Sequence, residues 1–417
     1  MIVVSHPTGN QFVRAVLAGF ESVGVLGEFD TAFSFDPDSM LGRLVPAGAR
    51  RHLARRHFAG IDQRLIRQRP WRELARLTAL AVGLRRLTRH ETGWASVDGV
   101  YRDLDAWVAE RLPRLQRQGV LGIYAYEDEA FRSFAVAGEI GMRKYYDLPI
   151  GYWRVGRALM QEEAERSPEW APTLTGNLDS ASKLERKDAE LEGADVIFVA
   201  SSFTQKTLSA AKGAANKPVV IAPYGAPPTI TEREFAERGK KIGHGPLRAL
   251  FVGSLTQRKG IAEVFAATRR LHAWVELTVI GRKPAVCPAL EAALKHCRYI
   301  PSLPHHGILQ EMRRHDVLLF PSLFEGFGLV ILEAMAQGLP VITTSHTAGP
   351  DVLIDGREGF IVPIRSVDAI IEKLVYLLRH PRDLQEMARK AVLRAQENTW
   401  ADYAEKTIAA IREDLAI

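Results

Sequence analysis

The sequence predicts an α/β protein of two domains, and three observations support this fold class. A chain of 417 residues is long enough for two domains that each bury a core of their own. Short apolar runs, each followed by a loop and a helix-forming stretch, begin at residue 1 and again near residue 250, as in parallel sheets. Between them, residues 226–246 carry prolines, glycines and charges without hydrophobic periodicity, which is typical of a linker.

In the first domain, residues 1–225, apolar runs alternate with helix-forming stretches such as 11–22. Strands are expected at 1–5, 122–126, 145–150, 194–203 and 219–225. His6 follows the first strand, at the edge of the sheet where open α/β folds bind ligands. His6 therefore has two readings, a substrate contact or a loop histidine whose ring is satisfied locally.

Arginine is concentrated between residues 43 and 90, with leucine and alanine interleaved at roughly helical spacing. One reading is a basic amphipathic face that rests on anionic lipid or on an acidic acceptor. The other is a solvated helical face. Nucleic-acid binding is not expected, because only Trp71 lies among the arginines to stack on bases. The arginines are Arg50, Arg51, Arg55, Arg56, Arg64, Arg67, Arg69, Arg72, Arg76, Arg85, Arg86 and Arg89.

The second domain, residues 247–400, opens with a strand, a loop with Arg258 and Lys259, and a helix over 261–271. Further strands are expected at 277–281 and 299–301, and helices at 368–379, 382–397 and 400–415.

Residues 316–344 hold the most informative pattern in the chain. The apolar run 316–320 predicts a buried strand, and Gly326 and Gly328 allow a sharp turn with room for a ligand. The helix formers at 329–337 follow, and a glycine and a proline end that helix before a strand at 341–344. Free N–H groups near residues 326–329 would suit a phosphate.

Two carboxylates flank this turn. Glu325 precedes the helix, and Glu333 lies eight positions later, which is about 12 Å at helical rise. Carboxylates repel a pyrophosphate, so hydroxyl binding is the more sensible role for them. A nucleoside diphosphate sugar carries hydroxyl-bearing rings on both sides of its pyrophosphate, at a similar separation. The alternative is two ordinary glutamates on a common strand–helix unit.

The string from Glu325 to Val341 resembles the E-x7-E signature of retaining GT-B glycosyltransferases, family 4 (glycosyl transferases group 1) in particular. The resemblance is strongest over residues 247–365. It implies the GT-B fold, two Rossmann-like domains facing each other across a cleft, with the last helix, 401–417, completing the first domain. It implies that Glu325 holds hydroxyls of the donor sugar and Glu333 those of the ribose. The amides implied for the diphosphate are those of Gly326, Phe327, Gly328 and Leu329.

The resemblance also places a basic pair on the donor diphosphate. Lys259 matches the family lysine that precedes a glycine, whereas Ser254 stands after Gly253 where the family usually has arginine. Arg258 is the candidate to supply that charge, because burying phosphates without cations is very costly. The alternative is a solvated basic loop. The family reads the base between two loops, which makes Ile300 and Arg282 the candidates in this chain.

In the family, a residue at the end of the strand 122–126 faces the reacting centre. The family often has histidine or aspartate at this position, and the candidates in this chain are Tyr126, Glu127 and Asp128. The alternative is that Glu127 and Asp128 simply cap the next helix near its N-terminus. The residues expected at the reacting centre are Glu325, Arg258, Lys259, Glu127 and Asp128.

No cofactor and no metal are expected besides the nucleotide diphosphate sugar, which is the donor substrate, because GT-B enzymes generally need no metal for the diphosphate. The adjacent histidines His305 and His306 are interpreted as polar loop. Cys287 and Cys297 fit neither a metal-ligand spacing nor a disulfide framework, which indicates free thiols in a reducing compartment.

The location expected from the sequence is cytoplasmic. No apolar run approaches a membrane span, and a strand that starts at residue 1 leaves no room for a signal peptide. If the arginine-rich face binds anionic lipid, the protein would sit peripherally at the inner face of the membrane.

The predicted function is transfer of a sugar, of hexosyl type and with retention, from the nucleotide diphosphate sugar to an acceptor. The acceptor would be a glycan, a glycolipid or a small molecule. Two alternatives stay open. A GT-B-fold nucleotide sugar epimerase would convert the donor alone, and a non-catalytic nucleotide sugar binding protein would bind the donor without hydrolysis or transfer.

Overall fold

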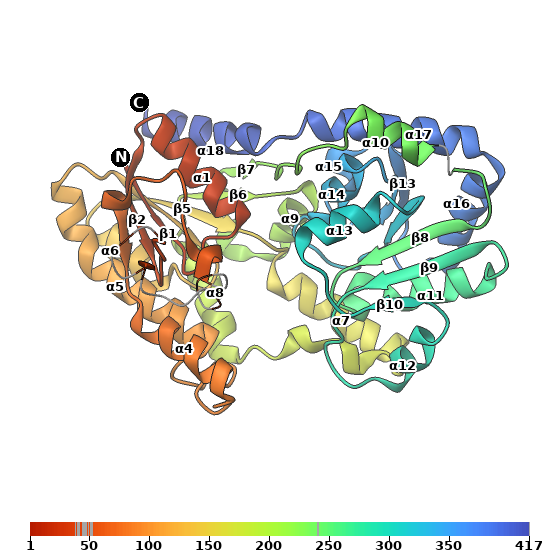
Figure 1. Ribbon diagram of the computed structural model, residues 1–417. Helices are drawn as coiled ribbons and strands as arrows, with labels where there is room; N and C mark the ends of the chain where they lie inside the picture. The colour runs from red at the N-terminus through yellow and green to blue at the C-terminus, as the bar shows by residue number, and fades with distance from the viewer. Residues whose placement is uncertain are drawn as a thin grey trace.

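The computed structural model describes residues 1–416, apart from 38, 40–41, 44–47, 49, 51–52 and 240–241. Its chain forms two lobes, each built around one parallel sheet (Figure 1). The first sheet has seven strands in the order β3-β2-β1-β4-β5-β6-β7, and the second has six in the order β10-β9-β8-β11-β12-β13. This arrangement confirms the predicted fold class of two Rossmann-like domains.

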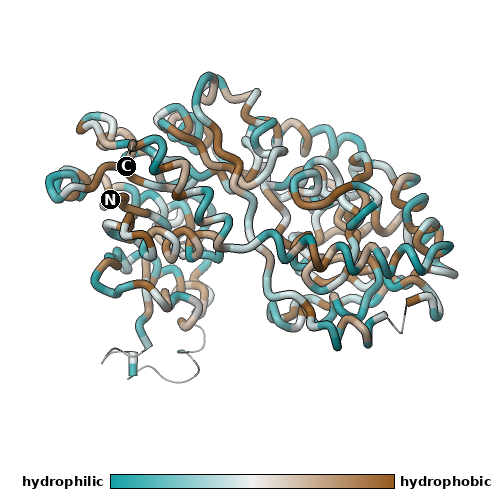
Figure 2. Tube along the Cα trace, turned by 90° about the horizontal axis from the view of Figure 1, so that it is seen from above, coloured by the Kyte–Doolittle hydropathy of each residue, from teal (hydrophilic) through white to brown (hydrophobic). Residues whose placement is uncertain are grey.

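The strands of the first sheet are β1 (Ile2–Ser5), β2 (Leu26–Thr31), β3 (Ile66–Gln68), β4 (Gly122–Tyr126), β5 (Arg143–Leu148), β6 (Val196–Val199) and β7 (Val219–Ile221). Those of the second sheet are β8 (Leu247–Val252), β9 (Val275–Ile280), β10 (Arg298–Ile300), β11 (Val317–Phe320), β12 (Val341–Thr344) and β13 (Gly359–Val362). Figure 2 shows hydrophobic segments inside both lobes, as expected for sheets that helices cover on both faces.

Helices flank the sheets. In the first lobe they are α1 (Gln11–Ser22), α4 (Trp71–Val82), α5 (Val97–Arg117), α6 (Phe131–Glu139), α7 (Trp153–Arg166), α8 (Ala181–Gly193) and α9 (Ser202–Thr207). The second half of the chain has α10 (Glu232–Gly239), α11 (Ile261–Arg270), α12 (Pro288–Leu294), α13 (His305–Met312), α14 (Val330–Ala336), α15 (Gly349–Val352), α16 (Val367–Arg379), α17 (Pro381–Gln396) and α18 (Trp400–Leu415).

The last helix, α18, returns from the second lobe to the first and packs on α1 (Figure 1). Thr399 begins it with a capping box, in which its side chain and that of Asp402 satisfy each other's backbone N–H groups. Trp400 stacks on Tyr224 with the ring centroids 5.9 Å apart. This contact anchors the start of α18 to the end of the first lobe.

One segment of the first half of the chain leaves its own lobe. Residues 153–177, which we call the arm, extend from the end of β5 along the second lobe before the chain returns to α8 (Figure 1, yellow). Trp170 in this arm belongs to the apolar core of the second lobe and stacks on Phe265 of α11 at 6.0 Å. The thiol of Cys287 donates to the carbonyl of Glu169 at 3.2 Å. The arm therefore fastens one lobe to the other.

Among the described residues, no helix combines the length and the apolarity that crossing a bilayer requires. Both cysteines are free thiols, Cys287 buried and Cys297 partly buried.

Candidate active site

The glycine turn lies between β11 and α14, where the lobes meet. Gly328 has φ +84°, a left-handed conformation that suits glycine, and the helix runs over Val330–Ala336, slightly shorter than expected. Leu329 precedes α14 without a side-chain cap. Among the described residues, none accepts a hydrogen bond from the N–H groups of residues 326–329. The ring of Phe327 packs against Tyr224, with the centroids 5.1 Å apart.

The glycine at 326 is required because the other lobe approaches it closely. A Cβ at Gly326 would lie 1.8 Å from the carbonyl oxygen of Pro149, in the loop after β5. The carbonyl of Gly326 accepts hydrogen bonds from the hydroxyls of Ser201 at 2.5 Å and Thr204 at 3.0 Å, at the start of α9. The turn is thus held from both lobes, which a sequence pattern within one domain could not indicate.

The basic loop after β8 brings Lys259 and Arg258 to Glu325. Lys259 Nζ lies 2.6 Å and Arg258 Nη1 3.1 Å from Glu325 Oε1, and the hydroxyl of Ser322 donates to the same oxygen at 3.2 Å. Gly253, with φ +147°, leaves room for the Lys259 side chain, which a Cβ there would touch at 3.1 Å. Arg258 therefore approaches the same carboxylate as Lys259, and the predicted contact of both cations with a diphosphate stays a prediction.

Electrostatics at this cluster keep Glu325 ionised. Burial acts to raise the pKa of Glu325, but Lys259 and then Arg258 outweigh it, so that the pKa lies below its usual value. Burial lowers the pKa of Lys259, and Glu325 only partly offsets this. Glu325 and Lys259 therefore form an ion pair that is largely shielded from water.

Glu333 lies in the first turn of α14 and faces α13. His305 Nε2 lies 3.0 Å from Glu333 Oε1, and this hydrogen bond raises the pKa of His305. The sequence interpretation of His305 as plain loop was therefore incomplete, since His305 begins α13 and contacts the second glutamate. A histidine so far along the chain from Glu333 gave no local signal. His306 contributes no described contact of this kind.

Three other residues expected at the donor lie around the same edge of the second sheet. Ile300 ends β10 and is half-buried beside the apolar core, Ser254 is exposed after β8, and Arg282 is exposed after β9. None of them contacts Glu325 in the described structure, so their roles stay predictions.

A cavity of about 230 Å³ lies between the lobes next to this cluster. Glu127 from the end of β4 and Arg258 and Phe324 from the second lobe line it together. The structure therefore brings Glu127 to the basic loop, as predicted for a residue near the reacting centre. The rest of the lining comes mainly from the arm and α8, and comprises Ile150, Gly151, Trp153, Gly156, Arg157, Met160, Gly176, Asp179, Leu184 and Lys187. A larger hollow of about 1080 Å³ beside α11 and α12 contains none of the glycine-turn or basic-loop residues.

Glu127 is paired inside this cavity. Lys187 Nζ lies 3.2 Å from Glu127 Oε2, and burial nevertheless raises the pKa of Glu127. Asp128 lies outside the cavity lining, with φ +77° and its carboxylate 3.6 Å from Lys183 Nζ. Asp128 thus belongs to an ion-pair network rather than to the shared cavity.

The alternative that Glu127 and Asp128 cap the next helix is wrong. Helix α6 begins after Ala130, which has no side-chain cap. Its first N–H groups, on Arg132 and Ser133, donate instead to the carboxylate of Asp105 in α5, at 2.7 and 2.9 Å. A capping carboxylate that comes from another helix is invisible to a local sequence rule.

His6 is satisfied by its own loop. Its Nδ1 accepts the N–H groups of Thr8 at 3.1 Å and Gly9 at 2.9 Å, and burial lowers its pKa to about 3. The ring is therefore neutral and fixed, which favours the structural reading of this histidine over a substrate contact.

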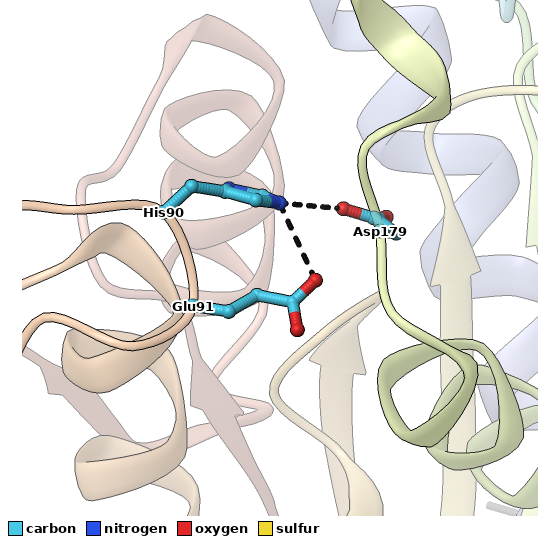
Figure 3. Close-up of side chains that lie close together, drawn as sticks. All are labelled: His90, Glu91 and Asp179. Atoms are coloured by element: carbon cyan, nitrogen blue, oxygen red, sulfur yellow. Dashed lines mark ion pairs between the residues drawn. The ribbon is translucent and has the colours of Figure 1, made fainter.

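One group among the described residues has the composition of a metal site, His90, Glu91 and Asp179 (Figure 3). His90 Nε2 lies 3.2 Å from Asp179 Oδ1, but the same oxygen lies 3.1 Å from Lys183 Nζ. An ammonium group already neutralises this carboxylate and would repel a metal ion. The cluster is an ion-pair network between the loop before α5 and the start of α8.

Much of the arginine-rich region serves structure. Arg56 and Arg76 pair with the buried Glu73, and Arg69 and Arg72 with Asp103. Arg51 lies outside the described residues. A different group lies at the end of α4 and the loop after it, where exposed apolar side chains accompany exposed arginines without a described ion pair. We call it the basic apolar patch: Leu80, Val82, Leu84, Arg85, Arg86, Leu87, Arg89 and Trp94.

Comparison with known proteins gives a family match for one part of the chain. Residues 232–394 match the family described as Glycosyl transferases group 1. This segment carries the basic loop, Glu325 and Glu333. The resemblance stated from the motif is therefore confirmed.

The curated relatives match only part of the chain. A glycogen synthase of Mycobacterium tuberculosis is 31% identical over 183 residues, which cover 42% of this chain and 43% of that protein. A D-inositol 3-phosphate glycosyltransferase of Kribbella flavida is 34% identical over 115 residues, covering 28% of this chain and 27% of that protein. The chain therefore matches less than half the length of these relatives.

Solved structures match the whole fold at low identity. The sucrose-phosphate synthase of Thermosynechococcus elongatus superposes with a TM-score of 0.68 at 17% identity, covering 100% of this chain and 99% of that one. Anabaena HepE in complex with UDP and glucose gives a TM-score of 0.60 at 14% identity, covering 98% of each chain. These likenesses confirm the GT-B fold.

Proposed function

We propose that this protein transfers a sugar from a nucleoside diphosphate sugar to an acceptor. The observation that carries the proposal is the convergence of Lys259 and Arg258 on Glu325 beside a turn with free N–H groups. The cations and the N–H groups suit a diphosphate, and the carboxylate suits sugar hydroxyls. The family match of residues 232–394 supports the assignment, because it covers both cations, Glu325 and the glycine turn.

On this proposal, donor binding replaces the ion pairs that Glu325 makes with Lys259 and Arg258. The diphosphate contacts Lys259 and Arg258, which frees Glu325 for the hydroxyls of the sugar, while Glu333 accepts hydroxyls of the ribose. The two cations and the amides of the glycine turn stabilise the charge that develops on the departing diphosphate.

We further propose that transfer is of hexosyl type and retains the anomeric configuration, as the resemblance to family 4 implies. The acceptor oxygen forms a bond to the anomeric carbon while the bond from that carbon to the diphosphate breaks. A phosphate oxygen of the leaving diphosphate takes the acceptor's proton. The chain's own part is to position both substrates and to balance charge, without a metal ion at the diphosphate.

The cavity between the lobes is the proposed acceptor site. Its walls combine apolar side chains such as Trp153 and Met160 with the charged Glu127, Arg157 and Lys187. A mixed lining of this kind suits a small polar molecule or the end of a glycan, whose hydroxyls need polar partners and whose ring faces need apolar ones. On this proposal, Glu127 accepts a hydrogen bond from a hydroxyl of the acceptor substrate.

We also propose that the protein is cytoplasmic and touches an anionic membrane surface through the basic apolar patch. Exposed Leu84, Leu87 and Trp94 would enter the interface, and Arg85, Arg86 and Arg89 would contact lipid phosphates. Liposomes with and without anionic lipid test this by flotation at low and high salt. We expect binding only with anionic lipid and less of it at high salt, because salt screens the attraction. Equal flotation without anionic lipid would contradict it.

The enzyme class is tested first on the nucleotide. Thermal-shift screening of UDP, GDP and ADP identifies the diphosphate that stabilises the fold by mass action. Lys259→Ala and Arg258→Ala should each weaken its binding by about 1.5–3 kcal/mol, the range for charged hydrogen bonds. Calorimetry that finds unchanged affinity in both variants would remove the phosphate site.

The matching nucleotide sugar then separates the reaction classes. Incubated alone, it should stay intact or hydrolyse slowly, and with a suitable acceptor it should give a glycoside of unchanged anomeric configuration. Conversion of the nucleotide sugar to an epimer without acceptor would indicate the epimerase instead. Binding without any turnover, across an acceptor screen, would indicate a binding protein.

A further inference from the structure

The arm of the first lobe reaches the basic loop of the second lobe at Gln257. Residues 257–259 form one short helical turn that carries Arg258 and Lys259, and Gln257 is its first residue. The backbone N–H of Gln257 donates to the hydroxyl of Thr173 in the arm at 2.9 Å. Its side chain donates to Glu163, also in the arm, at 2.9 Å. Two contacts from another lobe therefore hold the start of this turn.

The side-chain amide of Gln257 has all its polar groups engaged. Its Nε2 donates to Glu163 Oε1 at 2.9 Å and to Glu263 Oε2 at 2.8 Å, and its Oε1 accepts the N–H of Ala262 at 2.9 Å. Gln257 is completely buried, so water cannot replace a lost partner. Loss of Glu163 would leave one Nε2–H of Gln257 without its partner and remove a restraint on the turn that follows.

Glu163 is itself a completely buried carboxylate. Its Oε2 accepts from Arg365 Nε at 2.7 Å, so that the charge is paired while Oε1 remains directed at Gln257. Burying an ion pair contributes little to stability compared with an apolar contact of the same size, although breaking one is costly. Such a pair is better suited to fixing an orientation than to adding stability.

We propose that Glu163 is a positioning residue for donor binding, which acts from the first lobe through Gln257 on the turn that presents Arg258 and Lys259. The inference rests on the proposed function, since it takes the diphosphate as the ligand of that turn. It adds that the phosphate site is complete only when the arm is docked on the second lobe. Donor affinity then depends on the arrangement of both lobes and not on the second lobe alone.

The test is a double-mutant cycle on nucleoside diphosphate affinity. Calorimetry with the diphosphate chosen from UDP, GDP and ADP is carried out on the wild type, Glu163→Gln, Lys259→Ala and the double variant. Glu163→Gln should weaken binding about tenfold, the change expected when a charged hydrogen bond is lost. In the Lys259→Ala background the same substitution should add about twofold or less, because residues that act through one another are not additive.

Glu162→Gln is the matched control. Glu162 also contacts Arg365, at 3.2 Å, but it is exposed and does not reach Gln257. Its substitution should leave the affinity within about twofold of the wild type. A purely structural role for the arm would lower the melting temperature without this pattern of coupling. Thr173→Val, which removes the other contact to Gln257, gives a second route to the same test should Glu163→Gln fold poorly.

Three results would overturn the inference alone, and a fourth would overturn the proposed function with it. Unchanged affinity in both Glu163→Gln and Thr173→Val would show that the arm does not support the turn. Fully additive losses in the cycle would show that Glu163 acts elsewhere, and an equal loss in Glu162→Gln would assign the effect to Arg365. Unchanged affinity in Lys259→Ala would remove the phosphate site, and with it the proposed function.

Discussion

Replacing Glu325 by glutamine should destabilise the ligand-free protein and tighten its hold on the nucleoside diphosphate. In the free protein, Glu325 Oε1 lies 2.6 Å from Lys259 Nζ and 3.1 Å from Arg258 Nη1, at a carboxylate that is 8% exposed. Removing one partner of a buried pair costs about 3–5 kcal/mol. Glutamine keeps an oxygen that can accept from Lys259, so we expect a loss of about 2 kcal/mol.

The bound state should not share this loss, because the phosphates then pair with both cations. Free energy lost only by the free form appears as tighter binding, about tenfold for each 1.4 kcal/mol. We therefore expect Glu325→Gln to bind the diphosphate about 25-fold more tightly, since about 2 kcal/mol is lost by the free form alone. The intact nucleotide sugar should gain less affinity than the diphosphate does, and turnover should be much reduced.

Calorimetry with the diphosphate and with the intact donor, together with melting curves with and without ligand, measures all three effects. Glu358→Gln is the control, since Glu358 is also buried in the second lobe but pairs with Arg357, away from the basic loop. It should be destabilised without any gain in affinity. Weaker diphosphate binding in Glu325→Gln would refute the exchange of partners, even if the variant were less stable.

Two further predictions concern the same turn. The raised pKa of His305 means that it is charged and bonded to Glu333 below that pKa. Diphosphate affinity should therefore rise as the pH passes upward through that pKa, and more steeply in the wild type and in His306→Ala than in His305→Ala, where only the phosphate itself titrates; equal slopes in all three would contradict this competition. Gly326→Ala would place a Cβ 1.8 Å from the Pro149 carbonyl, so X-ray scattering should show the lobes further apart and activity should be lost; an unchanged scattering profile would contradict it.

The sequence predicted what is local or belongs to a strong motif. The strand, glycine turn and helix around Glu325 follow from residue types within one short stretch, and the structure places their bounds within a residue or two. The resemblance implied that Lys259 and Glu325, 66 positions apart, belong to one site, but their direct ion pair was not predicted. The contacts of the arm lay beyond both kinds of reasoning, because Glu163 and Gln257 are 94 positions apart and neither belongs to the motif.

The arginine-rich region also shows what composition alone does not reveal. Composition marked it as basic, but it did not indicate which arginines find acidic partners, as four of them do at Glu73 in the first turn of α4 and at Asp103 in α5. Composition did not distinguish the arginines that form ion pairs from the arginines of the basic apolar patch. Only the fold distinguishes a cation that holds a helix in place from one that faces solvent.

The docked arm also determines which crossover points would give a folded chimera with a related protein. An experimenter who exchanged donor specificity by joining a foreign second lobe at the linker 226–246 would leave residues 153–177 behind with the first lobe. Glu163, Thr173 and Trp170 would then face a surface with which they had not evolved. A chimera should therefore carry the arm together with the second lobe, as a second crossover within the first half of the chain. The unit of exchange in this protein is discontinuous in sequence, although each lobe looks self-contained.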